Sequence, residues 1–180
     1  KSMTRRAIKV STYVMAPLMF GLAFCAESVV RLILTEKWLP CVLFLRIFCI
    51  SYMFWPIHTA NLNAIKAMGR SDLFLKLEII KKIIGIVLLV ATMKISVEAM
   101  AYSLLISSVY SQIINSWPNR KLLHYGYLEQ LKDILPGILL AVGMGVCVYF
   151  IGKFPLPYDI LLIIQVVVGG IIYLMGSIIF

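Results

Sequence analysis

Long apolar runs separated by short polar clusters dominate the amino-acid sequence. A helix that spans a bilayer needs roughly 20 mostly apolar residues. Six runs reach that length, at about residues 8–26, 40–63, 73–93, 97–117, 134–152 and 158–180. The pattern therefore predicts an all-α integral membrane protein with six transmembrane helices.

Two polar segments lie between these runs and carry scattered apolar residues. They are "ESVVRLILTEKWLP", residues 27–40, and "NRKLLHYGYLEQLKD", residues 119–133. A polar face combined with a narrow apolar face is typical of helices that lie in the membrane surface. We therefore predict two short interfacial helices, one before the second span and one before the fifth.

A different polar segment, "NLNAIKAMGRSDLFLKLEIIKK" at residues 61–82, joins the second and third spans. Gly69, Arg70 and Asp72 predict a tight turn within it. Gly69 is expected to end the second helix with a positive φ, and Ser71 or Asp72 to cap the next helix.

Composition supports the membrane interpretation. Of the 180 residues, 62% are hydrophobic and 14% are charged, whereas about a quarter of a typical soluble domain is charged. The net charge of +9 is compatible with nucleic acid, but in a membrane chain basic residues more often mark cytoplasmic loops and anionic lipids. We therefore expect no nucleic-acid partner. The four cysteines lack metal-ligand spacing, so they predict reduced packing residues and neither a metal site nor a cofactor.

The distribution of basic residues sets the expected orientation. If Lys1 starts in the cytoplasm, segments 1–9, 66–82 and 120–132 carry twelve Lys and Arg residues, and the outer segments carry four: Arg31, Lys37, Lys94 and Lys153. Cytoplasmic loops carry the excess of positive charge. Both ends of the chain are therefore expected in the cytoplasm.

Polar residues inside the second span raise the question of function. Arg46 lies roughly 9 Å along the helix from Pro40. One interpretation is an arginine that extends to the outer head groups; the other is a cation that binds phosphate in a cavity. Asn61 is a further polar residue near the inner end of this span. His58 is interpreted as an interhelical hydrogen-bond partner or a proton-linked switch, and Pro56 predicts a kink.

The fourth span carries a polar stripe at steps of four residues, which places its members on one helix face. Small polar residues serve either close helix packing or the lining of a hydrated cavity, and the sequence leaves both open. The stripe consists of Ser103, Ser107, Ser111 and Asn115. We treat these residues, with Arg46 and Asn61, as candidate substrate-binding residues.

Two segments resemble a known family. "PLMFGLAFCAESVVRLILTEKWLP" at residues 17–40 and the "GRSD" turn within residues 61–82 are similar to the C-terminal part of Wzx-like bacterial polysaccharide flippases. These proteins belong to the multidrug/oligosaccharidyl-lipid/polysaccharide exporter superfamily.

The resemblance implies a chain that forms about half of a two-bundle transporter, with residues 1–180 as the C-terminal bundle of a fragment and an N-terminal bundle as its missing partner. It also implies a location in the bacterial inner membrane. The substrate would be a polyprenyl-diphosphate-linked oligosaccharide, flipped to the outer leaflet for lipopolysaccharide, capsule or exopolysaccharide synthesis, with membrane lipids as further partners. With such a substrate, Arg46 would contact the diphosphate, and Asn61 and the polar stripe of the fourth span would face the sugars.

Three other functions remain as alternatives. A drug or small-molecule exporter of the same superfamily would favour acidic residues at mid-membrane, which these spans lack. A membrane glycan polymerase or ligase would need a large outer loop, and the predicted outer loops are short. A structural membrane subunit would not need an intramembrane arginine. The sequence shows no catalytic constellation, so we expect a transporter that is not an enzyme.

Overall fold

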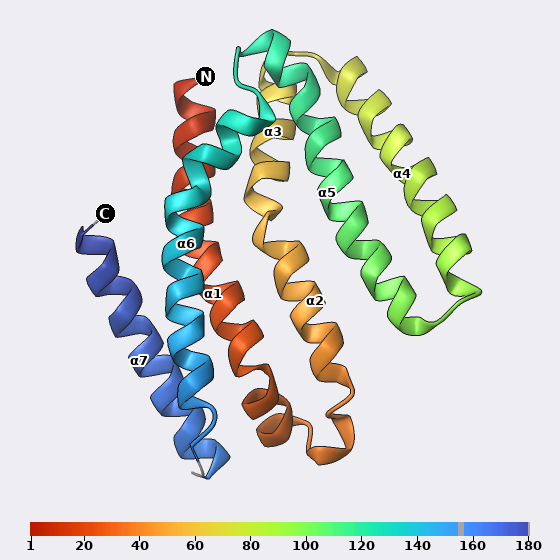
Figure 1. Ribbon diagram of the computed structural model, residues 1–180. Helices are drawn as coiled ribbons and strands as arrows, with labels where there is room; N and C mark the ends of the chain where they lie inside the picture. The colour runs from red at the N-terminus through yellow and green to blue at the C-terminus, as the bar shows by residue number, and fades with distance from the viewer. Residues whose placement is uncertain (155–156, 180) are drawn as a thin grey trace. The chain divides into compact units, whose positions relative to one another are not determined.

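A computed structural model describes residues 1–154 and 157–179 (Figure 1), and none of these residues forms a strand. The chain is an all-α membrane protein, as the sequence predicts. Its elements are α1 (Ser2–Ile33), the 3₁₀ turn η1 (Glu36–Trp38), α2 (Cys41–Met53), α3 (Trp55–Ala67), α4 (Ser71–Met93), α5 (Val97–Leu122), α6 (Tyr127–Ile151) and α7 (Tyr158–Ile179).

Five helical stretches within the described residues are long and apolar enough to cross a membrane. They are Ser2–Phe24, Cys41–Ala67, Val97–Leu122, Tyr127–Ile151 and Tyr158–Ile178. The prediction of six such spans is therefore corrected to five on length and composition. The remaining long helix is α4, which fails because Lys76, Glu78, Lys81 and Lys82 all lie in its first half.

The chain folds into two compact units. Unit 1 comprises Lys1–Thr12 and Phe54–Ile134, and unit 2 comprises Tyr13–Met53 and Leu135–Phe180. In unit 1, α5 packs against both α3 and α4. Within unit 1, Lys81 of α4 is buried and binds Glu78 at 2.5 Å.

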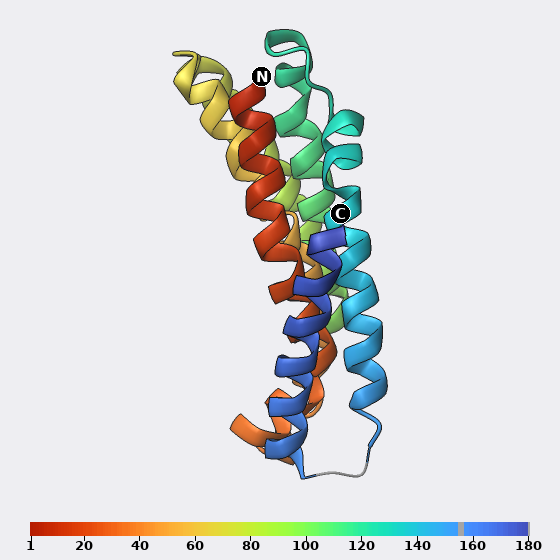
Figure 2. The same ribbon diagram turned by 90° about the vertical axis from the view of Figure 1, so that its left-hand side faces the viewer.

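Unit 2 is held together by close approaches between large side chains and glycines. The Phe24 ring of α1 lies directly over Gly145 of α6, and Leu140 of α6 lies over Gly176 of α7. Figure 2 shows α6 and α7 running side by side. Small residues permit such packing where the bilayer provides no hydrophobic drive between helices.

The second predicted span is interrupted at the expected place. Helix α2 ends at Met53, Phe54 has φ −88° and ψ 2°, and α3 begins at Trp55 with Pro56 in its first turn. Proline lacks the N–H that a continuous helix would use and its ring clashes with the preceding turn. The break predicted from Pro56 is confirmed.

The two predicted interfacial helices are wrong. Residues 27–33 continue α1, residues 119–122 belong to α5, and residues 127–133 belong to α6. The physical reason for the first is an ion-pair cluster on α1: Arg31 binds Glu27 at 3.0 Å and Glu36 at 2.7 Å. The bonded Glu27 carboxylate raises the pKa of Arg31. These charges satisfy one another, so the helix extends beyond its apolar stretch.

The turn between α3 and α4 has the predicted positive φ, at Gly69, with a value of 70°. The Arg70 N–H donates to the carbonyl of Ile65, which closes the end of α3. The predicted cap by Ser71 or Asp72 is wrong, because Arg70 occupies the N-cap position without a side-chain cap bond. Asp72 instead accepts a hydrogen bond from Arg70 at 3.3 Å, and this bond lowers its pKa.

Substitution of Gly69 by valine is expected to lower the amount of folded protein. A left-handed conformation costs a residue with a Cβ about 1–2 kcal/mol, and β-branching adds to that strain. A Cβ at this position would meet no other atom within 4 Å, so the effect is one of backbone conformation alone. The measurement is membrane abundance of full-length protein. Gly69→Asn is the control, since asparagine tolerates this conformation; equal losses for both variants would contradict the explanation.

Candidate functional site

A network of buried amides joins α3, α5 and α6 in unit 1. The Asn61 Nδ2 group donates to Ser116 Oγ at 3.1 Å and to Gln130 Oε1 at 2.7 Å. The Asn61 Oδ1 atom accepts from Asn119 Nδ2 at 2.8 Å and from Gln130 Nε2 at 3.0 Å. All four side chains are buried.

This network uses the full hydrogen-bonding capacity of one asparagine side chain, which offers two donors and two acceptor positions. Polar groups within hydrocarbon are costly unless other protein groups satisfy them. Asn61 therefore holds three helices of unit 1 together. A contact between Asn61 and sugar stays a prediction.

The polar stripe of α5 makes bonds within its own helix and to its two neighbours. Ser107 donates to Tyr110, whose hydroxyl donates to the carbonyl of Lys81 in α4 at 3.1 Å. Asn115 Nδ2 lies 2.7 Å from His58 Nδ1 of α3, in accord with the interhelical interpretation of His58. Ser103 is buried and donates to the Met100 carbonyl, and Ser111 is half-buried. Substrate contacts by these residues stay predictions.

Arg46, the remaining candidate, lies in unit 2 on α2. Its side chain is half-buried, and its Nε donates to the backbone carbonyl of Ala23 in α1 at 3.2 Å. Among the described residues no carboxylate lies within ion-pair distance of Arg46. Arg31 on α1, by contrast, binds two carboxylates. Arg46 thus carries a positive charge that no carboxylate of the described residues neutralises.

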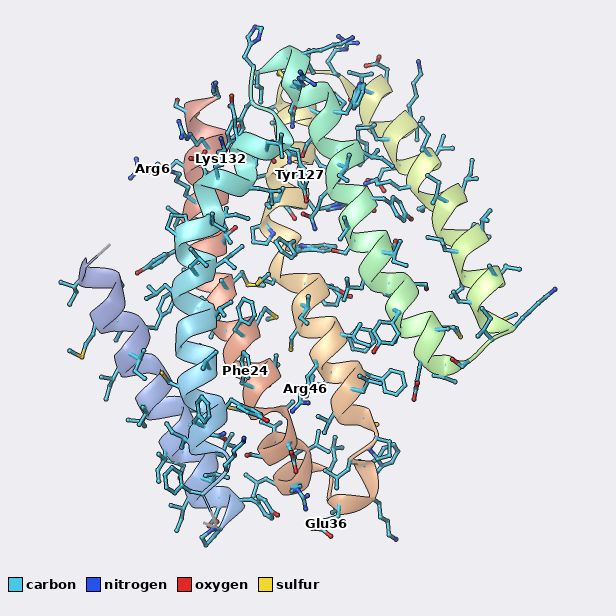
Figure 3. All side chains as sticks on the ribbon, in the orientation of Figure 1. Arg6, Phe24, Glu36, Arg46, Tyr127 and Lys132 are labelled. Carbon is cyan, nitrogen blue, oxygen red and sulfur yellow. The ribbon has the colours of Figure 1, made fainter. Side chains whose placement is uncertain are left out.

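Arg46 lines a partly polar pocket of 160 Å³. Figure 3 shows Arg46 and Phe24, two of its lining residues, on neighbouring helices. The polar groups of its lining come from α1, α2, α6, α7 and the turn after α6: Glu27, Ser28, Arg46, Tyr149, Lys153, Tyr158 and Gln165. We call this site the Arg46 pocket.

Gln165, at the wall of the Arg46 pocket, is buried and fixed from two sides. Its Oε1 accepts a hydrogen bond from Ser28 Oγ at 3.1 Å, and its Nε2 donates to the Val148 carbonyl at 3.2 Å. The sequence analysis missed both Gln165 and Gln130 of the unit 1 network. A single glutamine in the otherwise apolar α7 is the signal that could have identified Gln165. Gln130 lies beside Glu129 in a polar stretch of the sequence, which gives no such signal.

The charges of the Arg46 pocket favour an anion. Lys153 lies 5.0 Å above the centre of the Tyr149 ring and, like Arg46, has no carboxylate partner within the described residues. The carboxylate in the lining, Glu27, already binds Arg31. A guanidinium offers a planar pair of donors that matches phosphate oxygens, and an ammonium adds a second positive charge. The pocket can therefore hold a phosphate or diphosphate group.

Among the described residues there is no group of three or more metal-ligating side chains. The cysteines Cys25, Cys41, Cys49 and Cys147 are all free. The chemistry that the unit 2 site offers is therefore charge complementarity and hydrogen bonding.

Comparison with known proteins gives one match, over residues 1–43, to the family described as polysaccharide biosynthesis protein. This segment covers α1, η1 and the first residues of α2, and it includes the residues 17–40 on which the sequence resemblance rests. It also contains Phe24, Glu27 and Ser28 of the Arg46 pocket. No curated protein and no solved structure matches the chain significantly.

Proposed function

We propose that the chain is part of a membrane transporter that flips a polyprenyl-diphosphate-linked oligosaccharide from the cytoplasmic to the outer leaflet of the bacterial inner membrane. The observation that carries the proposal is a half-buried arginine without a carboxylate partner, Arg46, which lines a pocket in a membrane chain. The match of residues 1–43 to polysaccharide biosynthesis proteins supports the substrate class.

The physical task of such a protein is to lower the cost of moving a charged head group through hydrocarbon. A diphosphate in a medium of low dielectric constant is strongly destabilised unless charges of opposite sign accompany it. Arg46 and Lys153 supply two such charges, and Gln165 and Ser28 supply fixed dipoles beside them. The lipid is moved without the making or breaking of a bond, so the proposed protein is a transporter and not an enzyme.

The proposal includes an orientation and a partner. The proposal takes α4 as a sixth crossing in addition to the five apolar spans, so that both ends of the chain lie in the cytoplasm, as the excess of basic residues in segments 1–9, 66–82 and 120–132 favours. Lys153 and the Arg46 pocket then lie toward the outer leaflet. A second helical bundle of the same full-length protein provides the opposite wall of the transport path.

Reconstitution tests the proposed function directly. We expect the full-length protein that contains this chain to speed the transfer of a fluorescent polyprenyl-diphosphate-linked oligosaccharide across vesicle membranes. An impermeant glycosidase added outside reports the fraction of glycan exposed, and protein-free vesicles serve as the control. Equal rates with and without protein would refute transport. Recovery of free oligosaccharide or a longer glycan before glycosidase addition would instead indicate an enzyme.

A further inference from the structure

Unit 1 carries a concave site of its own, a pocket of 540 Å³ between the end of α5 and the start of α6 (Figure 1). Its lining residues fall between positions 113 and 129, so all of them belong to unit 1. None of them lines the Arg46 pocket. The volume lies within the range of about 300–1,000 Å³ that is usual for ligand sites. We call this site the α5–α6 pocket.

The loop that lines one side of the α5–α6 pocket, residues 123–126, is held in place by other parts of unit 1. The His124 carbonyl accepts a hydrogen bond from Lys1 Nζ at 2.6 Å. Tyr125 is fully buried, and its hydroxyl donates to the Asp133 carboxylate at 2.8 Å. The wall of the pocket is therefore formed before any ligand binds, as is usual for small-molecule sites.

The α5 wall of the pocket changes from apolar to charged along the helix. Ile113, Trp117 and Arg120 all line it. Their spacing of four and three residues places them on one helix face, and they cover about 10 Å of its length. The head-group region of one leaflet is about 5–8 Å thick, and tryptophan is enriched at that depth. The wall is therefore long enough to reach from hydrocarbon, at Ile113, to the level of lipid phosphates, at Arg120.

Arg120 gives the polar end of the pocket a positive charge that is not neutralised. Among the described residues no carboxylate lies within ion-pair distance of Arg120. The carboxylate in the lining, Glu129, lies 3.6 Å from Lys1 Nζ. A guanidinium can bind two phosphate oxygens through parallel N–H groups. A ligand that fills the pocket therefore has an anionic group at one end and apolar chains at the other.

We propose that the α5–α6 pocket binds an anionic phospholipid of the phosphatidylglycerol type. Its phosphate lies against Arg120, and the first carbons of its acyl chains lie beside Trp117 and Ile113. A zwitterionic phospholipid brings an ammonium group into the same basic end and so fits less well. The inference goes beyond the proposed function and does not depend on it. In the proposed orientation the bound lipid belongs to the cytoplasmic leaflet, where it joins the end of α5 to the start of α6.

Arg120 and Lys121 form a matched pair for the test. They are consecutive, exposed basic residues, and only Arg120 lines the pocket. Replacement by glutamine removes one positive charge at either position. A loss of lipid binding that both variants share reports general attraction to a basic surface, and an additional loss with Arg120→Gln reports the pocket.

The experiment measures photo-crosslinking of the full-length protein in dioleoyl phosphatidylcholine nanodiscs. The probe is a trace of phosphatidylglycerol with a diazirine on its acyl chain near the glycerol, and crosslinked peptides are mapped by mass spectrometry. We expect labelling of residues 113–129 that dioleoyl phosphatidylglycerol competes away and that soluble glycerol 1-phosphate does not.

The variants are expected to differ in this labelling. Arg120→Gln should lower it by about tenfold or more, since the change removes hydrogen bonds to a charged group. Lys121→Gln should lower it by about fivefold or less, the effect of one basic residue near an anionic surface. Trp117→Ala alters the same wall and should also lower the labelling. An unfolding midpoint equal to that of the wild type shows that a variant is folded.

Four outcomes overturn the inference. Equal losses with Arg120→Gln and Lys121→Gln mean that the lipid is attracted by surface charge alone. Equal labelling by a phosphatidylcholine probe means that the pocket does not select an anion. Competition by glycerol 1-phosphate means that the ligand is a soluble phosphate compound. Absence of label from residues 113–129 means that another part of the full-length protein covers the pocket. Each of these outcomes leaves the proposed function standing.

Discussion

Replacement of Arg46 by alanine is expected to reduce export of the lipid-linked glycan severely, while the protein keeps its normal abundance in the membrane. Hydrogen bonds to charged groups contribute about 1.5–3 kcal/mol each. Loss of one or two of them from the head group's path therefore slows transport by about 10-fold to more than 100-fold. Arg46→Lys should fall between the wild type and Arg46→Ala, since an ammonium keeps the charge but loses the planar pair of donors.

The measurement is surface glycan in a flippase-deleted strain that carries each full-length variant, with membrane protein levels determined in parallel. Lys37→Ala is the control, because Lys37 is an exposed basic residue outside the Arg46 pocket. An arginine that only anchors α2 at the head groups would be replaced by lysine with little loss. Wild-type glycan with both Arg46 variants at matched abundance would rule out Arg46 as a substrate ligand.

Replacement of Asn61 by alanine is expected to destabilise unit 1 by about 2 kcal/mol. The change leaves Ser116, Asn119 and Gln130 short of partners, and each unsatisfied buried group costs about 1–3 kcal/mol. Interhelical hydrogen bonds in membranes contribute less, about 0.6 kcal/mol each on average, so the four bonds of the Asn61 side chain together contribute about 2 kcal/mol. The unfolding midpoint of the purified full-length protein in detergent measures the effect.

Asn63→Ala is the matched control, because Asn63 lies two residues further along α3 and is exposed. It should shift the midpoint little. A protein with Asn61→Ala that unfolds normally but no longer exports glycan would show the opposite of our expectation. Asn61 would then contact the substrate, as the sequence analysis predicted.

The sequence predicts those features that depend on local chemistry. Apolar runs place the ends of α7 to within one residue and those of α1, α5 and α6 to within seven residues, because the apolar run gives the length that spans hydrocarbon and not the polar turns that continue a helix beyond it. Pro56 identifies the break between α2 and α3, and Gly69 identifies the turn with positive φ. Each of these signals acts within one turn of helix.

The partners of polar side chains are what the sequence could not supply. Asn61 and Arg46 look alike as polar residues within one span. The structure bonds the first to side chains of α5 and α6 and leaves the second without a carboxylate. Likewise Glu27, Arg31 and Glu36 suggest a surface helix until their mutual pairing is seen. The bonds of Asn61 join segments that are distant in the sequence, so periodicity and spacing carry no record of them, whereas Glu27 and Arg31 are four residues apart and their pairing could have been predicted from that spacing.

The charged first half of α4 has a consequence for the membrane around unit 1. From residue 83 onward its apolar length is only about 16 Å, against about 30 Å of hydrocarbon in a typical bilayer. Lys81 cannot extend toward the head groups, because it is buried against Glu78. As the proposed sixth crossing, α4 is therefore expected to create hydrophobic mismatch, with a bilayer that is locally thinned beside this helix. The head groups of the two leaflets approach each other there. A polar head group that crosses the membrane next to α4 therefore passes through a thinner layer of hydrocarbon.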